Sequence, residues 1–167
     1  MSVDFIDLRF RGSPRVIATA LLNGPGGLTL IDPGPTSCLP ALEAGLRDRG
    51  VTLRDVRTLV LTHIHLDHAG AAGTIVERVP GIRVYVHERG APHLIDPSRL
   101  MASASRIYGD KMDTLWGPMV PVPAASGWIS AARRCASPTR QDTRSTTSVI
   151  STSEPAWRTS ATPAASA

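Results

Sequence analysis

Three of the five histidines in this chain of 167 residues fall within six positions, together with one carboxylate. The segment is Thr62-His63-Ile64-His65-Leu66-Asp67-His68-Ala69-Gly70. It follows residues 57–62, a short apolar run of the kind that forms a buried central strand. Imidazole and carboxylate groups are good ligands for Zn²⁺, at roughly 2.0–2.2 Å. The sequence therefore predicts a metal site where this strand ends.

The end of a strand also explains how these side chains could converge. His63 and His65 lie two residues apart, so an extended backbone places both on one side. Asp67 and His68 follow where the chain turns towards a helix, and they can face a second point nearby. Two metal ions held close together would polarise a carbonyl or phosphoryl group and lower the pKa of a bridging water. The alternative, a solvated histidine-rich loop, suits a single histidine better than the pattern His-x-His-x-Asp-His.

At these residues the chain resembles the metallo-β-lactamase superfamily, whose signature motif the segment matches. The resemblance implies a metal-dependent hydrolase with an αββα sandwich fold and a metal site between the two sheets. It implies that His63 and His65 bind a first zinc ion and that Asp67 and His68 bind a second. In many members the aspartate also orients the nucleophilic water, which makes Asp67 the expected catalytic residue. Iron or manganese could take the place of zinc, because the same ligands suit several metals.

A second turn carries a weaker resemblance. Asp32-Pro33-Gly34 follows the apolar run 28–31 and resembles the superfamily's Asp-x-Gly turn. In that comparison Asp32 would lie behind the metal ligands and steady the loop that carries them. A plain turn carboxylate is an equally good interpretation of Asp32.

The elements that must position these residues alternate along the first 126 residues. Leu39, Leu42 and Leu46 recur at helical spacing and predict a buried helix face, with Thr36 or Ser37 as its N-cap. We expect strands over 4–10, 15–22, 28–31, 57–62 and 82–86, and helices over 37–49, over 71–78 and from Asp96-Pro97 onward. The predicted class is α/β (α+β), the N-terminal half of an αββα metallo-β-lactamase sandwich. Without the second sheet, the first would expose an apolar face.

Other candidate site residues have simpler interpretations. His87 and His93 lie six residues apart, match no common metal motif and are expected at the surface. Tyr108, Asp110 and Asp113 are expected at a solvated helix end rather than in a pocket. Cys38 is expected to be a buried structural thiol.

The last 41 residues differ from the rest. In 127–167, Ser, Thr, Ala, Arg and Pro fill 31 of 41 positions, and no apolar period is sustained. Such composition cannot bury a core, so we expect a low-complexity, disordered tail and a domain boundary after residue 126. The tail holds five arginines against two acidic residues, whereas residues 1–126 hold 13 basic and 12 acidic side chains. A basic tail is one form of nucleic-acid arm, but these arginines are scattered and have no aromatic platform, so no nucleic-acid partner is expected.

The superfamily's second-half ligands are missing from the sequence as it stands, because no histidine follows His93. The codons of this tail can also be translated in the frame that begins one base earlier. In that frame, each triplet joins the last base of one codon to the first two bases of the next. Over 139–152 this frame permits Y-T-P-G-H-A-V-H-H-V-S-Y-F-D, and over 158–166 it permits A-Y-V-G-D-T-G-G-V. These strings hold the superfamily's Thr-Pro-Gly-His and Gly-Asp in the expected order. The required G/C-rich codons agree with 17 arginines among 18 basic residues, so we infer a shifted frame between about residues 123 and 133.

The expected reaction is hydrolysis of an ester-like bond by metal-activated hydroxide, with a thioester or lactone as substrate, as in glyoxalase II. This truncated chain is expected to be weakly active or inactive. The alternatives are a non-catalytic metal-binding fragment, a pseudogene product and, last, an interaction module that uses the basic tail. Two cysteines, no visible signal peptide and no long apolar run predict a cytoplasmic protein with a small-molecule substrate and no membrane partner. The oligomeric state is left open.

Overall fold

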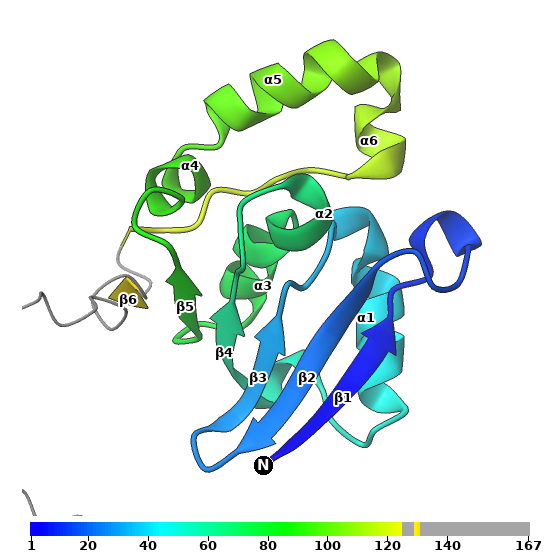
Figure 1. Ribbon diagram of the computed structural model, residues 1–167, viewed down its shortest axis with the longest axis vertical. Coiled ribbons are helices and arrows are strands. Elements are labelled where there is room, and N and C mark those ends of the chain that lie inside the picture. The colour runs from blue at the N-terminus through cyan, green and yellow to red at the C-terminus, as the bar shows by residue number, and fades with distance from the viewer. Residues whose placement is uncertain (125–128, 131–167) are drawn as a thin grey trace, which may run out of the picture. The chain divides into compact units, whose positions relative to one another are not determined.

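A six-stranded sheet, ordered β1 to β6 as in the sequence, organises the computed structural model, which describes residues 1–124 and 129–130 (Figure 1). The first three strands are antiparallel neighbours, and β3 to β6 run parallel to one another. The strands are β1 (Ser2–Asp7), β2 (Ala18–Gly24), β3 (Gly27–Ile31), β4 (Val56–Val60), β5 (Arg83–Val86) and β6 (Ile129–Ser130). The predicted mixed α/β class is confirmed.

Helices cover one face of this sheet and lie beyond the ends of two of its strands. Helices α1 and α3 connect parallel strands and pack behind the sheet, while α4, α5 and α6 lie beyond the ends of β4 and β5 (Figure 1). The α-helices are α1 (Leu39–Arg47), α2 (Leu66–Ala69), α3 (Ala72–Arg78), α4 (Ala91–Ile95), α5 (Ser98–Tyr108) and α6 (Met112–Leu115). Four 3₁₀ turns complete the described part: η1 (Phe10–Gly12), η2 (Thr36–Cys38), η3 (Leu53–Asp55) and η4 (Gly109–Lys111). No helix among these residues is long and apolar enough to cross a bilayer.

The core lies between the sheet and α1 and α3. Leu30 and Leu59, on adjacent parallel strands, are fully buried, as are Leu42 and Leu46 of α1 and Ile75 of α3. The predicted buried stripe of α1 is therefore confirmed. Because β3 and β4 form the centre of this core, the points at which they end are fixed relative to each other.

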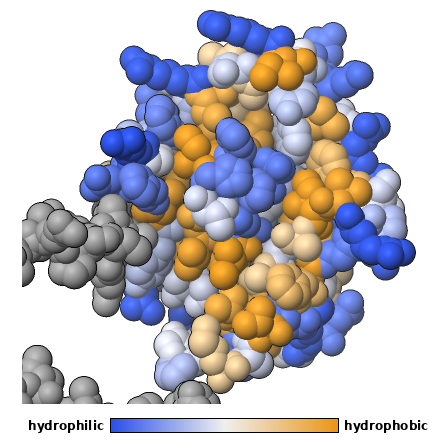
Figure 2. All heavy atoms as spheres, in the orientation of Figure 1, coloured by the Kyte–Doolittle hydropathy of each residue, from blue (hydrophilic) through white to orange (hydrophobic). Residues whose placement is uncertain are grey.

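The opposite face of the sheet is not covered by any described helix. Figure 2 views this face, and apolar residues gather across it. Phe5 is 65% exposed, and both Ala20, which pairs with it, and Ile31, which pairs with Ala20, are only partly buried. The expectation that the first sheet presents an apolar face agrees with this arrangement.

Two local predictions are wrong for identifiable reasons. Strand β1 ends at Asp7, not residue 10, because the Asp7 carboxylate accepts hydrogen bonds from the backbone N–H groups of Arg9 and Arg15, both at 2.9 Å, and folds the chain into a turn. Neither Thr36 nor Ser37 caps α1, which begins at Leu39 after a 3₁₀ turn. Their hydroxyls instead donate to Gly70 O at 3.1 Å and to Leu115 O at 2.6 Å. The turn after β3 is thereby tied to two distant segments.

Helix α3 approaches the chain after α6 so closely that it requires glycine. A Cβ built on Gly73 would lie 1.9 Å from the carbonyl oxygen of Val120. We predict that Gly73→Ala lowers the free energy of unfolding by about 1–3 kcal/mol, because a backbone atom must move to make room. Urea unfolding of the full chain measures this. Gly26→Ala is the control, since nothing lies within 4 Å of its Cβ position, and it should leave stability unchanged or slightly raised. Equal midpoints for the two variants would contradict the packing argument.

Candidate metal centre

The loop 62–70, here called the ligand loop, leaves the sheet directly after β4. Leu61 still donates to Tyr85 O at 2.8 Å, which continues the pairing with β5. His65 then precedes α2, and its carbonyl oxygen accepts from His68 N at 3.0 Å and from Ala69 N at 2.8 Å. This single helical turn follows the extended segment immediately, so side chains from both can face one point.

Asp32 connects the end of β3 to this loop. Its backbone N–H donates to Val60 O at 2.9 Å, and its φ of 52° is left-handed, a conformation that Asp tolerates better than most residues. The carboxylate accepts from Thr62 N at 2.8 Å and from the Thr62 hydroxyl at 2.6 Å, and it pairs with His68 Nδ1 at 3.0 Å. Its side chain is only 13% exposed. Asp32 thus lies behind the ligand loop and holds two of its residues.

Gly34 brings the same two segments together through the backbone. Its N–H donates to His68 O at 3.1 Å, and its carbonyl accepts from Ala71 N at 2.8 Å. Its φ is 81°, and a Cβ at this position would lie 2.3 Å from a methyl group of Leu8. Only glycine fits this turn without displacing the chain, which explains the Asp-x-Gly pattern physically.

These hydrogen bonds set the ring nitrogens of two histidines. The Thr62 hydroxyl has one proton, which it donates to Asp32, so it can only accept from His63 Nδ1, 2.9 Å away. His68 Nδ1 must likewise be the donor towards the Asp32 carboxylate. In the neutral ring each Nε2 then carries a lone pair. A partner on one ring nitrogen that orients the other is typical of metal-binding histidines.

The four predicted ligands converge. The ring centroids of His63 and His65 are 4.8 Å apart, those of His63 and His68 are 3.9 Å apart, and Asp67 Oδ2 lies 3.3 Å from His68 Nε2. Two groups have donor atoms that all lie within 4.8 Å of one another: Asp32, His63 and His68; and His63, His65 and Asp67. His63 belongs to both groups, so this grouping differs from the expected pairs His63–His65 and Asp67–His68. The assignment of ligands to individual ions stays a prediction.

The donor chemistry fits a cation. A neutral His68 presents a lone pair on Nε2 to a carboxylate oxygen of Asp67, two acceptors that repel each other. Either a proton on Nε2 or a cation between the two atoms would remove this repulsion. The pKa of His63 is lowered, chiefly by burial and further by the neighbouring His68 and His65. The carboxylates of Asp32 and Asp67 raise it, but by less. At pH 7 His63 is therefore neutral, the form that binds a metal.

A cavity of about 400 Å³ opens beside these donors. His65 and Asp67 line it on one side, and residues of α5 together with Trp116 line the other. Trp116 stacks on Phe10, with ring centroids 5.4 Å apart, and its Nε1 is buried without a hydrogen-bond partner among the described residues. Besides the carboxylate of Asp67 and the imidazole of His65, the lining consists of aliphatic, hydroxyl-bearing and aromatic side chains: Leu66, Leu100, Ser103, Ala104, Ile107, Tyr108 and Trp116.

The remaining candidates fall mostly where expected. His87 is exposed, and its Nδ1 accepts from Arg89 N at 3.2 Å, while Cys38 is buried and burial raises the pKa of its thiol. Neither His87 nor His93 joins a donor group among the described residues. Asp110 and Asp113 are exposed, and Tyr108 is the last residue of α5 and 36% exposed, as expected, although it also lines the cavity.

Two residues of this centre were not assigned a role from the sequence. Thr62 directly precedes the histidines, and a hydroxyl in that position was the available signal. No sequence signal pointed to Trp116, because its place in the cavity depends on how α5 and α6 fold back over the ligand loop.

Comparison with known proteins agrees with this geometry. A family model described as the metallo-β-lactamase superfamily matches residues 12–129. MEM-A1, a subclass B3 metallo-β-lactamase from a soil metagenome library, is 26% identical with a TM-score of 0.54, and the match covers 77% of this chain and 43% of that one. A Cronobacter sakazakii metallo-β-lactamase mutated in its HARLDQ motif is 23% identical, with a TM-score of 0.52 and coverage of 77% and 44%. SMB-1 bound to 2-mercaptoethanesulfonate is 21% identical, with a TM-score of 0.52 and coverage of 77% and 43%.

The last two similarities show the fold alone, and this chain spans less than half the length of each of the three enzymes. The family match covers most of the sequence, from the turn after β1 to β6. With the sheet, the Asp32 turn and the converging donors described above, it shows that the chain belongs to the metallo-β-lactamase superfamily and forms an N-terminal fragment of that fold.

Proposed function

We propose that the protein to which this sequence belongs is a dizinc hydrolase, with His63, His65, Asp67 and His68 as metal ligands. The observation that carries this proposal is the set of hydrogen bonds that leaves the Nε2 atoms of His63 and His68 as acceptors next to a carboxylate. A structural histidine cluster has no need to direct several acceptors at one point. Asp32 serves as the positioning residue behind them.

The proposed roles follow from where each side chain lies. When bound, divalent cations supply Lewis acidity, which polarises a carbonyl group and lowers the pKa of a coordinated water. Asp67 lies both among the donors and on the cavity wall, so its carboxylate can hold the proton of a water aimed at the substrate. The Asp32 carboxylate keeps the ring of His68 in one orientation directly, and that of His63 through Thr62.

The cavity supports an ester-like substrate with an apolar portion. Its wall offers aliphatic and aromatic groups with two hydroxyls, those of Ser103 and Tyr108. A thioester or lactone matches this lining. The similarity to MEM-A1, described as a β-lactamase, makes a β-lactam the alternative substrate. Hydrolysis rates of the complete protein on all three classes would separate them.

For this 167-residue chain alone we propose weak metal binding and little turnover. The described donor groups share His63, so two ions would compete for its single free nitrogen. A catalytic zinc normally has three protein ligands and a water. A non-catalytic metal-binding fragment is therefore the alternative, and metal content separates it from an inert product.

His63→Ala tests the metal centre. Because His63 belongs to both donor groups, we predict that its loss weakens Zn²⁺ binding by more than about tenfold, given that even outer partners of a ligand contribute roughly 10–100-fold. Isothermal titration of the metal-free chain at pH 7.5 measures the affinity. His93→Ala is the matched control, because it also removes a histidine but one outside both donor groups. It should bind Zn²⁺ as tightly as the unchanged chain does. Absence of Zn²⁺ binding by the unchanged chain, or equal weakening in both variants, would contradict the proposal.

Asp32→Asn tests the positioning role without removing the turn. Asn tolerates left-handed backbone as Asp does, so the change isolates the charge and one acceptor. We predict Zn²⁺ affinity lowered by about 10–100-fold, because Thr62 and His68 lose part of their support. Asp110→Asn removes the same charge from an exposed position and should have no effect. If Asp32→Asn binds Zn²⁺ like the Asp110 variant, Asp32 is only a turn residue.

We propose that residues 127–167 are an out-of-frame translation. The shifted frame permits two superfamily motifs in the expected order. Sequencing independent clones of the gene across the codons for 123–133 should find one base more or fewer than the present frame requires. The corrected product should bind about two Zn²⁺ per chain and hydrolyse one of the three substrate classes. An uninterrupted frame in every clone would refute this proposal and leave the hydrolase proposal standing.

A further inference from the structure

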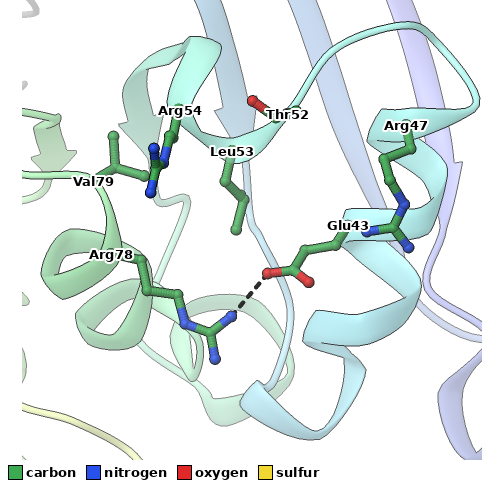
Figure 3. A pocket seen from close by; sticks show the side chains of 7 residues that line it. All are labelled: Glu43, Arg47, Thr52, Leu53, Arg54, Arg78 and Val79. Atoms are coloured by element: carbon green, nitrogen blue, oxygen red, sulfur yellow. Dashed lines mark hydrogen bonds and ion pairs between the residues drawn. The ribbon is translucent and has the colours of Figure 1, made fainter.

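A second cavity, of about 470 Å³, lies at the end of the parallel strands opposite to the metal centre (Figure 3). The metal centre follows the ends of β3 and β4. This cavity is lined by the last turns of α1 and α3 and by η3, the turn that leads into β4. Helices α1 and α3 each return the chain to the start of the next parallel strand. The last turns of both helices therefore meet η3 at the edge of the sheet where the parallel strands begin.

Arginine dominates the lining of this cavity. Arg47 comes from α1, Arg54 from η3 and Arg78 from α3. Glu43 is the one carboxylate in the lining, and its Oε1 accepts from Arg78 Nη1 at 2.8 Å. The lining therefore carries three positive charges and one negative charge, a net charge of +2. Within the part of the chain that the structure describes, no hydrogen bond or ion pair engages the side chain of Arg47 or Arg54.

Helix ends alone do not account for this arrangement. A basic residue in the last turn of a helix is favoured by the helix dipole, which explains Arg47 and Arg78 one at a time. It does not explain Arg54, which belongs to a 3₁₀ turn, or why the three side chains border one cavity. Figure 3 shows Arg78 reaching across to Glu43 of α1, with Arg54 beside Val79 at one end of the cavity and Arg47 beyond Glu43 at the other end.

The floor of the cavity is apolar. Leu53 and Val79 line it and are each only 8% exposed. The nearby Asp55 does not line the cavity, because its carboxylate accepts hydrogen bonds from the hydroxyl and the N–H of Thr52, both at 2.8 Å. An apolar floor in a cavity that three arginines line suits a ligand with an organic body and an anionic head. The volume lies within the range of small-molecule sites, about 300–1,000 Å³.

We propose that this cavity is a binding site for a small organic phosphate, a phosphate monoester whose charge of nearly −2 matches the lining. Guanidinium groups bind phosphate oxygens in paired hydrogen bonds, and Arg is favoured over Lys where that geometry matters. The ion pair of Arg78 with Glu43 is half-exposed and therefore weak, so Arg78 can add a bond to the ligand. The proposal does not depend on the hydrolase proposal, because no metal-ligand candidate lines the cavity.

Titration with phenyl phosphate tests this site. The full chain is used with EDTA at fixed ionic strength, so that phosphate bound at a metal does not contribute. We expect saturable binding with a Kd below about 1 mM, weakened about tenfold by Arg54→Gln and by Arg47→Gln, the loss expected for one charge-assisted hydrogen bond. Both arginines are exposed and unpaired, so both variants should unfold at the same temperature as the unchanged chain. Inorganic phosphate should bind more weakly than phenyl phosphate, because it leaves Leu53 and Val79 uncovered.

Arg106→Gln is the matched control, because Arg106 also lies exposed in the last turn of a helix, α5, away from this cavity. Its Kd should equal that of the unchanged chain. Equal weakening by Arg106→Gln and Arg54→Gln would mean attraction to net charge alone and would overturn the proposal. Unsaturable binding, or binding of phenol as tight as that of phenyl phosphate, would overturn it as well.

Discussion

The candidate metal centre depends on the carboxylate of Asp32, whose side chain is only 13% exposed. Asp32 accepts two hydrogen bonds from Thr62 and one from His68, and it therefore joins the end of β3 to both sides of the ligand loop. A carboxylate with little exposure needs hydrogen-bond partners, and these three donors supply them. As an acceptor, the carboxylate in return fixes which nitrogen of each ring is protonated. Structural support and ligand chemistry are thus the same interaction.

That interaction requires β3 and β4 to end side by side, which the core ensures. Leu30 and Leu59 are paired across the two strands and fully buried, so neither strand can slip by one residue without turning its core side chain to the other face. Asp32 and Thr62 continue from these strands. The register of the sheet therefore determines whether the carboxylate reaches the ligand loop at all.

The sequence predicted what short-range patterns determine. The spacing of His63, His65, Asp67 and His68 and the apolar runs of β3 and β4 were sufficient to predict that these four side chains converge. That they bind metal stays a prediction. The caps of α1 were predicted wrongly, because Thr36 and Ser37 bond to residues far along the chain instead of to their own helix. The cavity wall at Trp116 was missed for the same reason. Contacts between distant segments leave no local signal, and these contacts shape the space around the donors.

The two ends of the sheet differ in what their side chains can bind. At the ends of β3 and β4, acceptor atoms converge and attract cations. At the opposite edge, three arginines line a cavity with an apolar floor, which is the proposed anion site. The open sheet face is a third kind of surface, since Phe5 and its neighbours on β2 and β3 offer apolar contacts and no charge. Burying that face needs a further layer of structure, and a layer lying there would border the donors at the ends of β3 and β4. In the proposed complete protein, the same added layer could therefore cover the apolar face and supply the ligands that this chain lacks.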